Sequence, residues 1–418
     1  MIDTLKPSLL GLKRSFGFGD RLGLATPGHI DAIRNTPFLP IFAQQSIREL
    51  KRTGRKPEDV MSAAQTAVET ERWTKPWGAD ADHLQNRDDV LLMADCGYTF
   101  FTIDPSEYVD FHADTMSSQK LKSTYRDLVN GDCLTDSNIY DIYFNSIQEL
   151  DDGILLKFDN ASDLLRAIVK YGRALKYTND MFGWILEAMG ERPFEVELSI
   201  DETPTPTTPL EHLFIGMELK RMDVNVISIA PRFIGEFEKG IDYKGDLTIF
   251  TKHYKQHAAI ARYCGPYKIS IHSGSDKFAI YPIIGKLSKE YIHVKTAGTS
   301  YLEALRVICR TNIDLFRKLI EFSRERYTKD RTSYHVSANL NDIPAYLNDN
   351  ELEKWYLDSE FGRQVLHVTF GSILLKKNNN GKNFKEQILE CVTIHKDLYR
   401  ELLQKHLSKH ISLLMREY

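Results

Sequence analysis

The chain has 418 residues, of which 42% are hydrophobic and 27% charged, a composition typical of a globular protein. Its formal net charge is only -4, and its lysines and arginines are scattered, which argues against nucleic acid as the main partner. The N-terminus lacks the apolar core of a signal peptide, and no apolar run of about 20 residues occurs, so we expect a cytoplasmic protein that does not enter a membrane. Five cysteines without a close pair predict reduced thiols rather than disulfides or a CxxC metal site.

Eight short runs rich in β-branched and aromatic residues alternate with helical stretches, which is the pattern of parallel α/β folds. In chain order the runs begin at Arg14, Phe38, Lys75, Tyr98, Pro193, Val224, Tyr267 and Tyr291. Eight strands are what a closed barrel requires. The sequence therefore predicts an α/β fold of the (β/α)8 TIM-barrel type, with an open doubly wound sheet as the alternative.

Two segments exceed the needs of a minimal barrel. After the fourth run, residues from about 110 to 190 space their apolar side chains by three and four, which predicts a helical insertion. Residues 331–418 form a C-terminal extension, which we expect to pack on a barrel made of residues 1–330.

Polar residues at the carboxyl ends of barrel strands usually carry the chemistry of this fold. The third run ends in GADADHL, where Asp80, Asp82 and His83 supply two carboxylates and an imidazole, enough for a general base beside a metal ligand. The seventh run ends in ISIHSGSDK, where small residues after His272 let a ligand approach the backbone. A solvated loop or a core histidine would use the same residue types. We predict His83 and His272 as metal ligands.

The fourth and fifth runs add three further carboxylates. Asp104 ends the fourth run, where it either meets the substrate or caps a helix. Glu195 and Glu197 alternate along the fifth run and so face the same side. If that side is the barrel interior, the two carboxylates require a metal, a cation or a raised pKa. The alternative is a solvated edge strand.

The segments after the sixth, seventh and eighth runs offer a third ligand and cations. Glu236, or else Glu238, could complete a metal shell, although surface salt bridges explain most such residues. Lys277 and Lys295 could each pair with a carboxylate of a substrate.

The residues from Thr296 to Ser300 begin a helix whose backbone amides could bind an anionic group. His335 and His367 lie in the C-terminal extension, where they either close over the site or are structural.

Taken in order, the strand ends resemble those of the class II, metal-dependent fructose-bisphosphate aldolases, which are (β/α)8 barrels. The matching segments are ADH, IDPSE, FEVELS, IHSGSDK and VKTAGTSYLEA. The resemblance implies that Asp82 is a catalytic acid/base, that His83 and His272 bind zinc, and that Glu197 lies in the active site. A third zinc histidine of those aldolases has no counterpart here, and Glu236 or Glu238 stands in its place.

A closer resemblance covers nearly the whole chain. The segments FGFGDRLGLATPGHIDAI, PWGADADHL, APRFIGEFEKGIDY, KTAGTSYLEALRV and LHVTFGSIL are similar to those of bacterial tagaturonate epimerases. This resemblance implies a cytosolic enzyme that uses one divalent metal ion, such as zinc, nickel, cobalt or manganese. Its expected reaction is the interconversion of D-tagaturonate and D-fructuronate in hexuronate catabolism.

The two ketohexuronates differ at the carbon beyond the one adjacent to the ketone, so simple enolisation cannot interconvert them. One hypothesis is an aldolase-like route, in which a carbon–carbon bond breaks, the aldehyde fragment rotates and the bond re-forms. The other is direct deprotonation and reprotonation of the inverted carbon. In either route Asp82 would take a proton, Glu197 would return one, and Lys277 or Lys295 would hold the carboxylate.

Two other functions fit the same sequence. The first is an aldolase or a sugar-phosphate isomerase on the same barrel, since one fold hosts many reactions. The second is a non-catalytic binding subunit. The oligomeric state cannot be predicted from this sequence.

Overall fold

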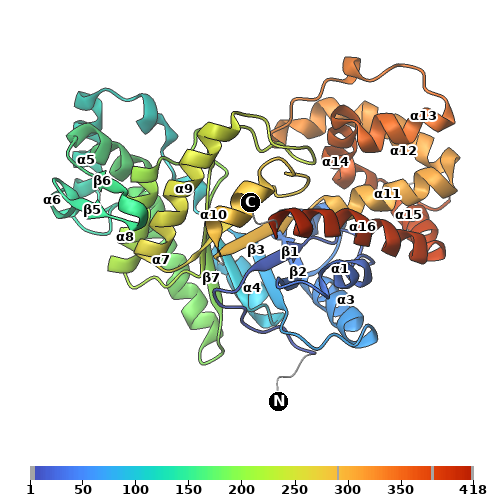
Figure 1. Ribbon diagram of the computed structural model, residues 1–418, viewed down its shortest axis with the longest axis horizontal. Coiled ribbons are helices and arrows are strands. Elements are labelled where there is room, and N and C mark those ends of the chain that lie inside the picture. The colour runs from blue at the N-terminus through green and yellow to red at the C-terminus, as the bar shows by residue number, and fades with distance from the viewer. Residues whose placement is uncertain (1–4, 290, 378–380, 416–418) are drawn as a thin grey trace.

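The computed structural model describes residues 5–289, 291–377 and 381–415, and its centre is a closed barrel of parallel strands (Figure 1). All eight predicted runs form barrel strands, so the predicted fold class is confirmed. The strands are β1 (Ser15–Phe18), β2 (Leu39–Ser46), β3 (Gly78–Leu84), β4 (Phe100–Ile103), β7 (Glu195–Ile200), β8 (Ser228–Pro231), β9 (Lys268–Ile271) and β10 (Ile292–Thr296). Their order around the barrel is β1-β10-β9-β8-β7-β4-β3-β2, and the pairing of Ser15 with both His293 and Leu39 closes the ring.

Burial along these strands is nearly complete, as it must be when helices cover the outside of a barrel and side chains fill the inside. In the described chain, every residue of the eight barrel strands is buried except Asp82 and His83, which are half-buried. The carboxyl end of β3 is therefore the place where the strands themselves open toward a cavity.

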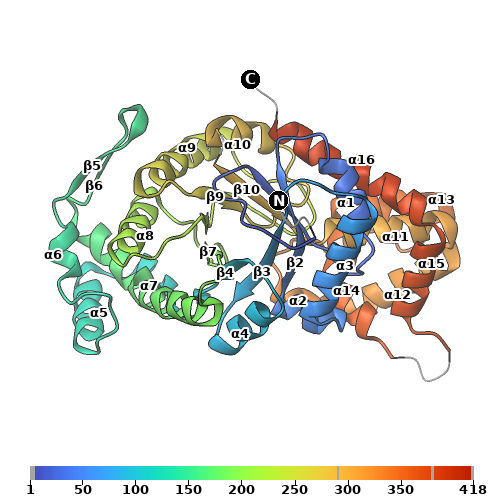
Figure 2. The ribbon, with the colours of Figure 1, turned by 90° about the horizontal axis from the view of Figure 1, so that it is seen from below.

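Helices surround the barrel on all sides, as Figure 2 shows in a view into it. They are α1 (Thr26–Ile33), α2 (Ile47–Thr53), α3 (Pro57–Thr70), α4 (Arg87–Asp95), α7 (Ala161–Met189), α8 (Pro209–Arg221), α9 (Leu247–Cys264), α10 (Tyr281–Ser288) and α11 (Thr299–Thr311). Local sequence sets where several of them begin. Ser46 ends β2 and caps α2 through the backbone N–H of Glu49, and Thr208 and Glu211 form a capping box at α8.

The segment between β4 and β7 holds α5 (Ser118–Asn130), α6 (Ile139–Tyr143) and the long helix α7. It also contains an antiparallel hairpin, β5 (Ile147–Glu149) and β6 (Leu155–Lys157), which the sequence analysis did not anticipate. Strands of three residues are too short to establish an alternating pattern. Figure 1 shows this segment at the left edge of the molecule, with the barrel between it and the C-terminal helices.

The chain after β10 and α11 continues as helices that pack against the barrel helices. They are α12 (Ile313–Asp330), α13 (Asp349–Glu353), α14 (Glu360–Leu375), α15 (Phe384–Ile394) and α16 (Lys396–Leu414). Helix α14 packs on α12 and α2, and α16 packs on α1 and α10. Residues far along the chain therefore reach the barrel, while the division at residue 330 stays a prediction.

Two sequence expectations about the whole chain can be compared with the structure. The five cysteines form no disulfide, and Cys264, Cys309 and Cys391 are buried. A search of the described helices finds none that is both long and apolar enough to cross a membrane.

Candidate active site

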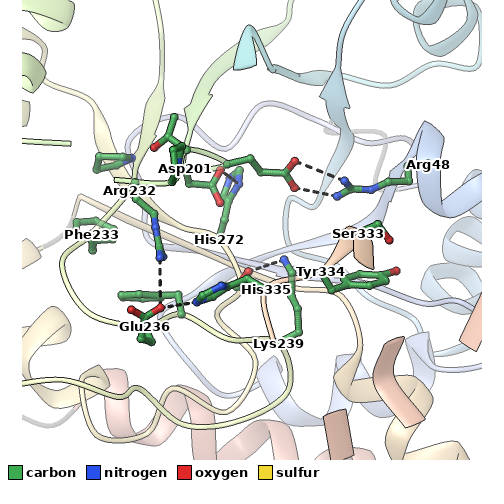
Figure 3. A pocket seen from close by; sticks show the side chains of 16 residues that line it. Arg48, Asp201, Arg232, Phe233, Glu236, Lys239, His272, Ser333, Tyr334 and His335 are labelled. Carbon is green, nitrogen blue, oxygen red and sulfur yellow. Dashed lines mark hydrogen bonds and ion pairs between the residues drawn. The ribbon is translucent and has the colours of Figure 1, made fainter. Parts of the chain in front are cut away.

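A cavity of about 360 Å³ lies at the carboxyl ends of the barrel strands. Its walls come from the segments that follow β2, β7, β8 and β9, together with residues 333–335 of the C-terminal extension (Figure 3). Asp201, Lys239 and His272 line both this cavity and an inner chamber of about 60 Å³, which reaches down to Asp82, His83 and Lys295. The predicted site residues at the ends of β3, β9 and β10 therefore meet in one place.

His83 has an uncommon backbone conformation, and its imidazole ring contacts a carboxylate. Its φ of 52° lies in the left-handed region, which non-glycine residues seldom adopt. Its Nδ1 lies 3.3 Å from Asp104 Oδ2, and Asp104 also accepts hydrogen bonds from Gln85 Nε2 at 2.9 Å and the Ser106 N–H at 3.1 Å. Asp104 does not line the cavity or the inner chamber, so it is placed to orient His83 rather than to touch a substrate.

His272 follows β9 and lies between two carboxylates. Its Nε2 is 2.7 Å from Glu197 Oε1, and its Nδ1 is 3.0 Å from Asp201 Oδ1. Burial opposes a charge on the ring, but Asp201 and Glu197 outweigh it and raise the pKa of His272 to about 9. Asp82 and Asp104 likewise overcome burial and raise the pKa of His83 to about 10. Both histidines therefore sit in a strongly negative environment that favours a bound cation.

One atom from each of His83, His272 and Asp201 lies within 4.8 Å of the others, a spacing that suits ligands of one metal ion. The centroids of the two imidazole rings are 5.0 Å apart. His272 Nδ1 is buried, and its contact of 3.0 Å with Asp201 Oδ1 is not aligned as a hydrogen bond, as expected of two atoms that face one ion. Two imidazoles and a carboxylate form a donor set that suits zinc and several other first-row ions.

The structure places the third carboxylate differently from the sequence expectation. Glu236 is 49% exposed at the rim of the cavity, where it contacts His335 and lies 3.7 Å from Arg232 (Figure 3). Glu238 accepts hydrogen bonds from Ser337 and from Gln364 and so fixes the C-terminal extension. The carboxylate beside the two histidines belongs instead to Asp201.

Asp201 is not among the site residues predicted from the sequence, although a signal for it was present. Asp201 follows the last residue of β7 directly, and polar residues in that position are the ones to inspect in a barrel. On this strand the prediction rested instead on Glu195 and Glu197, which alternate along it and face the barrel interior.

Lys295 lies at the centre of a buried carboxylate cluster at the base of the inner chamber. Its Nζ is 2.6 Å from Asp80, 2.9 Å from Asp82 and 2.8 Å from Glu197. Burial and the neighbouring carboxylates raise the pKa of Asp80 to about 7, whereas Lys295 outweighs burial and lowers the pKa of Asp82 and of Glu197. Asp82, which is half-buried and lines the chamber, is thus an ionised base that faces the cavity.

Glu197 occupies a different position from Asp82. It is fully buried, lines neither chamber, and accepts hydrogen bonds from Ser228 Oγ at 2.6 Å and from His272. Glu195 lies nearer the amino end of the barrel, where it accepts the backbone N–H groups of Leu10 and Gly11. The alternating glutamates therefore both face inward, and Lys295 supplies the cation that Glu197 requires.

Lys277 is buried and lines neither chamber. Its ammonium group donates to the backbone carbonyls of Glu238 at 2.8 Å and Ser275 at 3.2 Å, and also to that of Ile241. These bonds tie the loop after β8 to the loop after β9, and they leave Lys277 no donor for a substrate.

A closed parallel barrel with imidazoles, carboxylates and a lysine gathered at the carboxyl ends of its strands is the architecture of a (β/α)8-barrel enzyme. Comparison with known proteins narrows this class. The family model described as UxaE, tagaturonate epimerase, matches residues 1–414. The chain is 40% identical over 412 residues to the tagaturonate/fructuronate epimerase of Thermotoga maritima, with 98% of this chain and 82% of that protein covered.

Solved structures agree with this assignment. The fructuronate-tagaturonate epimerase of Cohnella laeviribosi in a complex with one glycerol is 38% identical and superposes with a TM-score of 0.93, covering 98% of this chain and 83% of that one. Its complex with two glycerols gives a TM-score of 0.93 at 37% identity, covering 99% and 84%. The chain belongs to the tagaturonate epimerase family and is an isomerase that acts on a carbohydrate.

A more distant likeness concerns the fold alone. A probable tagatose 6-phosphate kinase of Sinorhizobium meliloti 1021 is 12% identical with a TM-score of 0.50, covering 96% of this chain and all of that one.

Proposed function

We propose that this chain interconverts tagaturonate and fructuronate with the help of one divalent metal ion held by His83, His272 and Asp201. The family supports the reaction, and the observation that supports the ion is the grouping of His83, His272 and Asp201, in which one atom of each lies within 4.8 Å of the others and the buried Nδ1 of His272 faces Asp201. An ion bound there would act as a Lewis acid, stabilising negative charge on the oxygen atoms of the substrate.

The residues around this group suggest how the protein moves the proton. Asp82 lines the inner chamber, and Lys295 keeps it ionised, so it begins the reaction as a base. It would remove the proton from the hydroxyl on the carbon to be inverted. The bond between that carbon and its neighbour next to the ketone then breaks, which leaves an aldehyde and an enediolate. After the aldehyde has rotated, the bond re-forms on its other face and Asp82 returns the same proton.

The position of Glu197 favours this cleavage route over direct deprotonation of the inverted carbon. Direct inversion needs one group on each face of that carbon. Glu197 was the expected second group, but its carboxylate is buried beneath His272 and Lys295. We assign it a positioning role, in which it orients His272 and holds Lys295, whereas Asp82 alone serves both directions of proton transfer.

Metal reconstitution tests this proposal. The metal-stripped protein is refilled with zinc, nickel, cobalt or manganese, and its action on tagaturonate is followed by proton NMR. We expect fructuronate to appear only with a bound ion. Cleavage products that accumulate would indicate an aldolase instead. Unchanged tagaturonate with every ion would contradict the proposed reaction.

Two matched variants test the ligand set. Asp201→Asn should lower the bound metal content and the activity together, because it removes a charged ligand. Glu236→Gln should leave the metal content unchanged, since Glu236 is exposed and pairs with His335. If the metal content fell in Glu236→Gln and stayed unchanged in Asp201→Asn, the third ligand would be Glu236. If Asp82→Asn left the epimerase activity unchanged, Asp82 would not be the base of the reaction.

A further inference from the structure

A ketohexuronate carries a carboxylate that the protein must bind, and neither lysine singled out in the sequence is free to bind it. Lys277 donates to backbone carbonyls, and Lys295 is surrounded by three carboxylates of the protein. The cation that holds the substrate must therefore come from another part of the cavity.

Arg52 of the inner chamber has no carboxylate partner among the described residues, but its guanidinium group donates to Tyr334 and Ser333. In the outer cavity, Lys239 is the cation that no described carboxylate neutralises. Its Nζ donates to Ser273 Oγ at 2.6 Å, and it forms no ion pair with any described residue. In contrast, Arg48 pairs with Glu202 at 2.9 Å and Arg232 lies 3.7 Å from Glu236. In Figure 3 the side chain of Lys239 rises toward the middle of the cavity, and Lys239 lines the inner chamber as well.

Arg21 and His367, which line the same inner chamber, each have a buried polar atom without a hydrogen-bond partner among the described residues. Arg21, in the loop after β1, directs Nε and Nη2 to Glu49 at 3.0 and 2.8 Å, while its Nη1 has no partner within the described chain. His367 of α14 is 2% exposed, and its Nδ1 is equally unpartnered there. Because buried polar atoms are nearly always hydrogen-bonded, these two atoms indicate a polar ligand.

The N-terminus of α11 lies against His367. A Cβ atom on Gly298, the residue that precedes this helix, would fall 2.0 Å from His367 Cε1, and a Cβ on Gly240 would fall 3.3 Å from Nδ1. Both glycines therefore let the ring pack against the backbone. No side chain of the described residues caps α11, and Ala297 and Gly298 at the start of this helix line the inner chamber, where the positive end of the helix dipole favours an anion.

The electrostatic environment of His367 agrees with this arrangement. Burial lowers its pKa well below the ordinary value, and the charges of Arg21, Lys239 and Arg363 lower it further. Arg363 is neutralised by Asp276 at 2.6 Å and Arg21 by Glu49 at 2.8 Å, which leaves Lys239 as surplus positive charge. An anion bound here would compensate that charge.

We propose that the carboxylate of the substrate binds in the inner chamber between Lys239 Nζ, Arg21 Nη1 and the uncapped N-terminus of α11, with the ring of His367 beside it. This inference rests on the proposed function for the identity of the ligand. Lys239, Arg21 and His367 would then determine specificity for a uronate over the neutral ketohexose. Arg48 and Arg232 at the rim would remain paired with their glutamates.

Binding of unreactive sugars tests the subsite without relying on catalysis. Calorimetric titration of the metal-loaded protein with D-glucuronate should show binding, and D-glucose should bind at least tenfold more weakly, because charged hydrogen bonds contribute about 1.5–3 kcal/mol. Lys239→Gln should weaken glucuronate binding about tenfold or more, and Lys239→Arg should restore most of it. Lys252→Gln, on the exposed surface of α9, is the matched control and should change nothing.

Kinetics supply the second readout. Lys239→Gln should raise KM for tagaturonate about 10- to 100-fold with a much smaller change in kcat, because the contact with the carboxylate is present in the bound substrate and in the transition state alike. His367→Asn should give a smaller change of the same kind.

The outcomes separate the two proposals. Glucuronate binding that is absent in the wild-type protein, or unaffected by Lys239→Gln, would overturn the subsite. Glucuronate binding that depends on Lys239, in a protein that does not epimerise tagaturonate, would support the subsite and reject the proposed reaction.

Discussion

Asp104 and His83, which end neighbouring strands of the barrel, meet with Oδ2 and Nδ1 3.3 Å apart. Since Nδ1 faces this carboxylate, the other ring nitrogen of His83 is directed to the inner chamber. Carboxylates that orient a metal-binding imidazole in this way are worth about 10- to 100-fold in metal affinity.

Replacing Asp104 by Asn should therefore weaken metal binding about 10- to 100-fold without removing a ligand. The measurement is a competition titration with a chelator of known affinity. Asp110→Asn is the matched control, because Asp110 only accepts the backbone N–H of His112 in the following loop. Equal affinity in the Asp104→Asn variant and the wild-type protein would show that His83 does not depend on Asp104.

The buried cluster around Lys295 predicts a strong effect on stability. Lys295→Met would leave Asp80, Asp82 and Glu197 without their shared cation, and breaking a buried ion pair in this way costs about 3–5 kcal/mol. Adding Asp80→Asn should recover part of that loss, because it removes one of the repelling charges. Urea unfolding of the four proteins in a double-mutant cycle measures the coupling free energy, and purely additive effects would contradict the arrangement.

Because Gly298 packs against the ring of His367, a larger residue at position 298 should be tolerated only when residue 367 is made smaller. Gly298→Ala should destabilise the protein by about 1–3 kcal/mol, since the new methyl group would overlap the imidazole ring. In the His367→Ala background the same methyl group should have space, so the double variant should be nearly as stable as the His367→Ala variant. Thermal unfolding of the three variants tests this, and an equal cost of the methyl group in both backgrounds would show that the two residues do not touch.

The last helix predicts a dependence of stability on pH. His410 accepts the backbone N–H of Asp276 through Nε2 at 2.9 Å and lies 2.9 Å from the carbonyl of His406 through Nδ1, which fits a neutral ring. Burial lowers the pKa of His410 to about 3, whereas an unfolded histidine has a pKa of about 6.5. Between these values the unfolded chain binds more protons, so the contribution of His410 to stability is complete above pH 6.5 and is lost as the pH falls toward 3.

We therefore expect His410→Gln to reduce the slope of unfolding free energy against pH between pH 6.5 and 5 by up to about 1.4 kcal/mol per unit. Urea unfolding at several pH values in this window gives the slope. His112→Gln, at an exposed histidine, is the control. An unchanged slope in the His410→Gln variant would mean that the ring is already protonated in the folded protein.

The barrel was predictable because each strand is a short apolar run bounded by turns, and a strand buried on both faces needs that composition. The convergence of His83 and His272 followed from the same pattern, since strand ends share one rim of a barrel. Asp201 lies at such an end too and was within reach of the same reasoning.

Lys239 could not have been assigned from the sequence, and His367 could be named only as a residue that either closes over the site or is structural. Lys239 lies in a long loop without a repeating pattern, and its significance rests on the lack of a neighbouring carboxylate in space. His367 is one of many apolar-flanked positions on α14, and only the packing of that helix against Gly298 brings it to the cavity. Pairing among charges depends on tertiary distances that no local spacing encodes.

Asp276, in the loop after β9, contacts two histidines of α16, which is synthesised much later. During synthesis the eight strands are complete at Thr296, but Asp276 meets His406 and His410 only after the last helix has emerged from the ribosome. His367 likewise arrives after the barrel can close. A nascent chain thus contains its histidine and aspartate group before it contains the His367 wall of the inner chamber, so the group and the wall of the same pocket come from parts of the chain that are synthesised at different times.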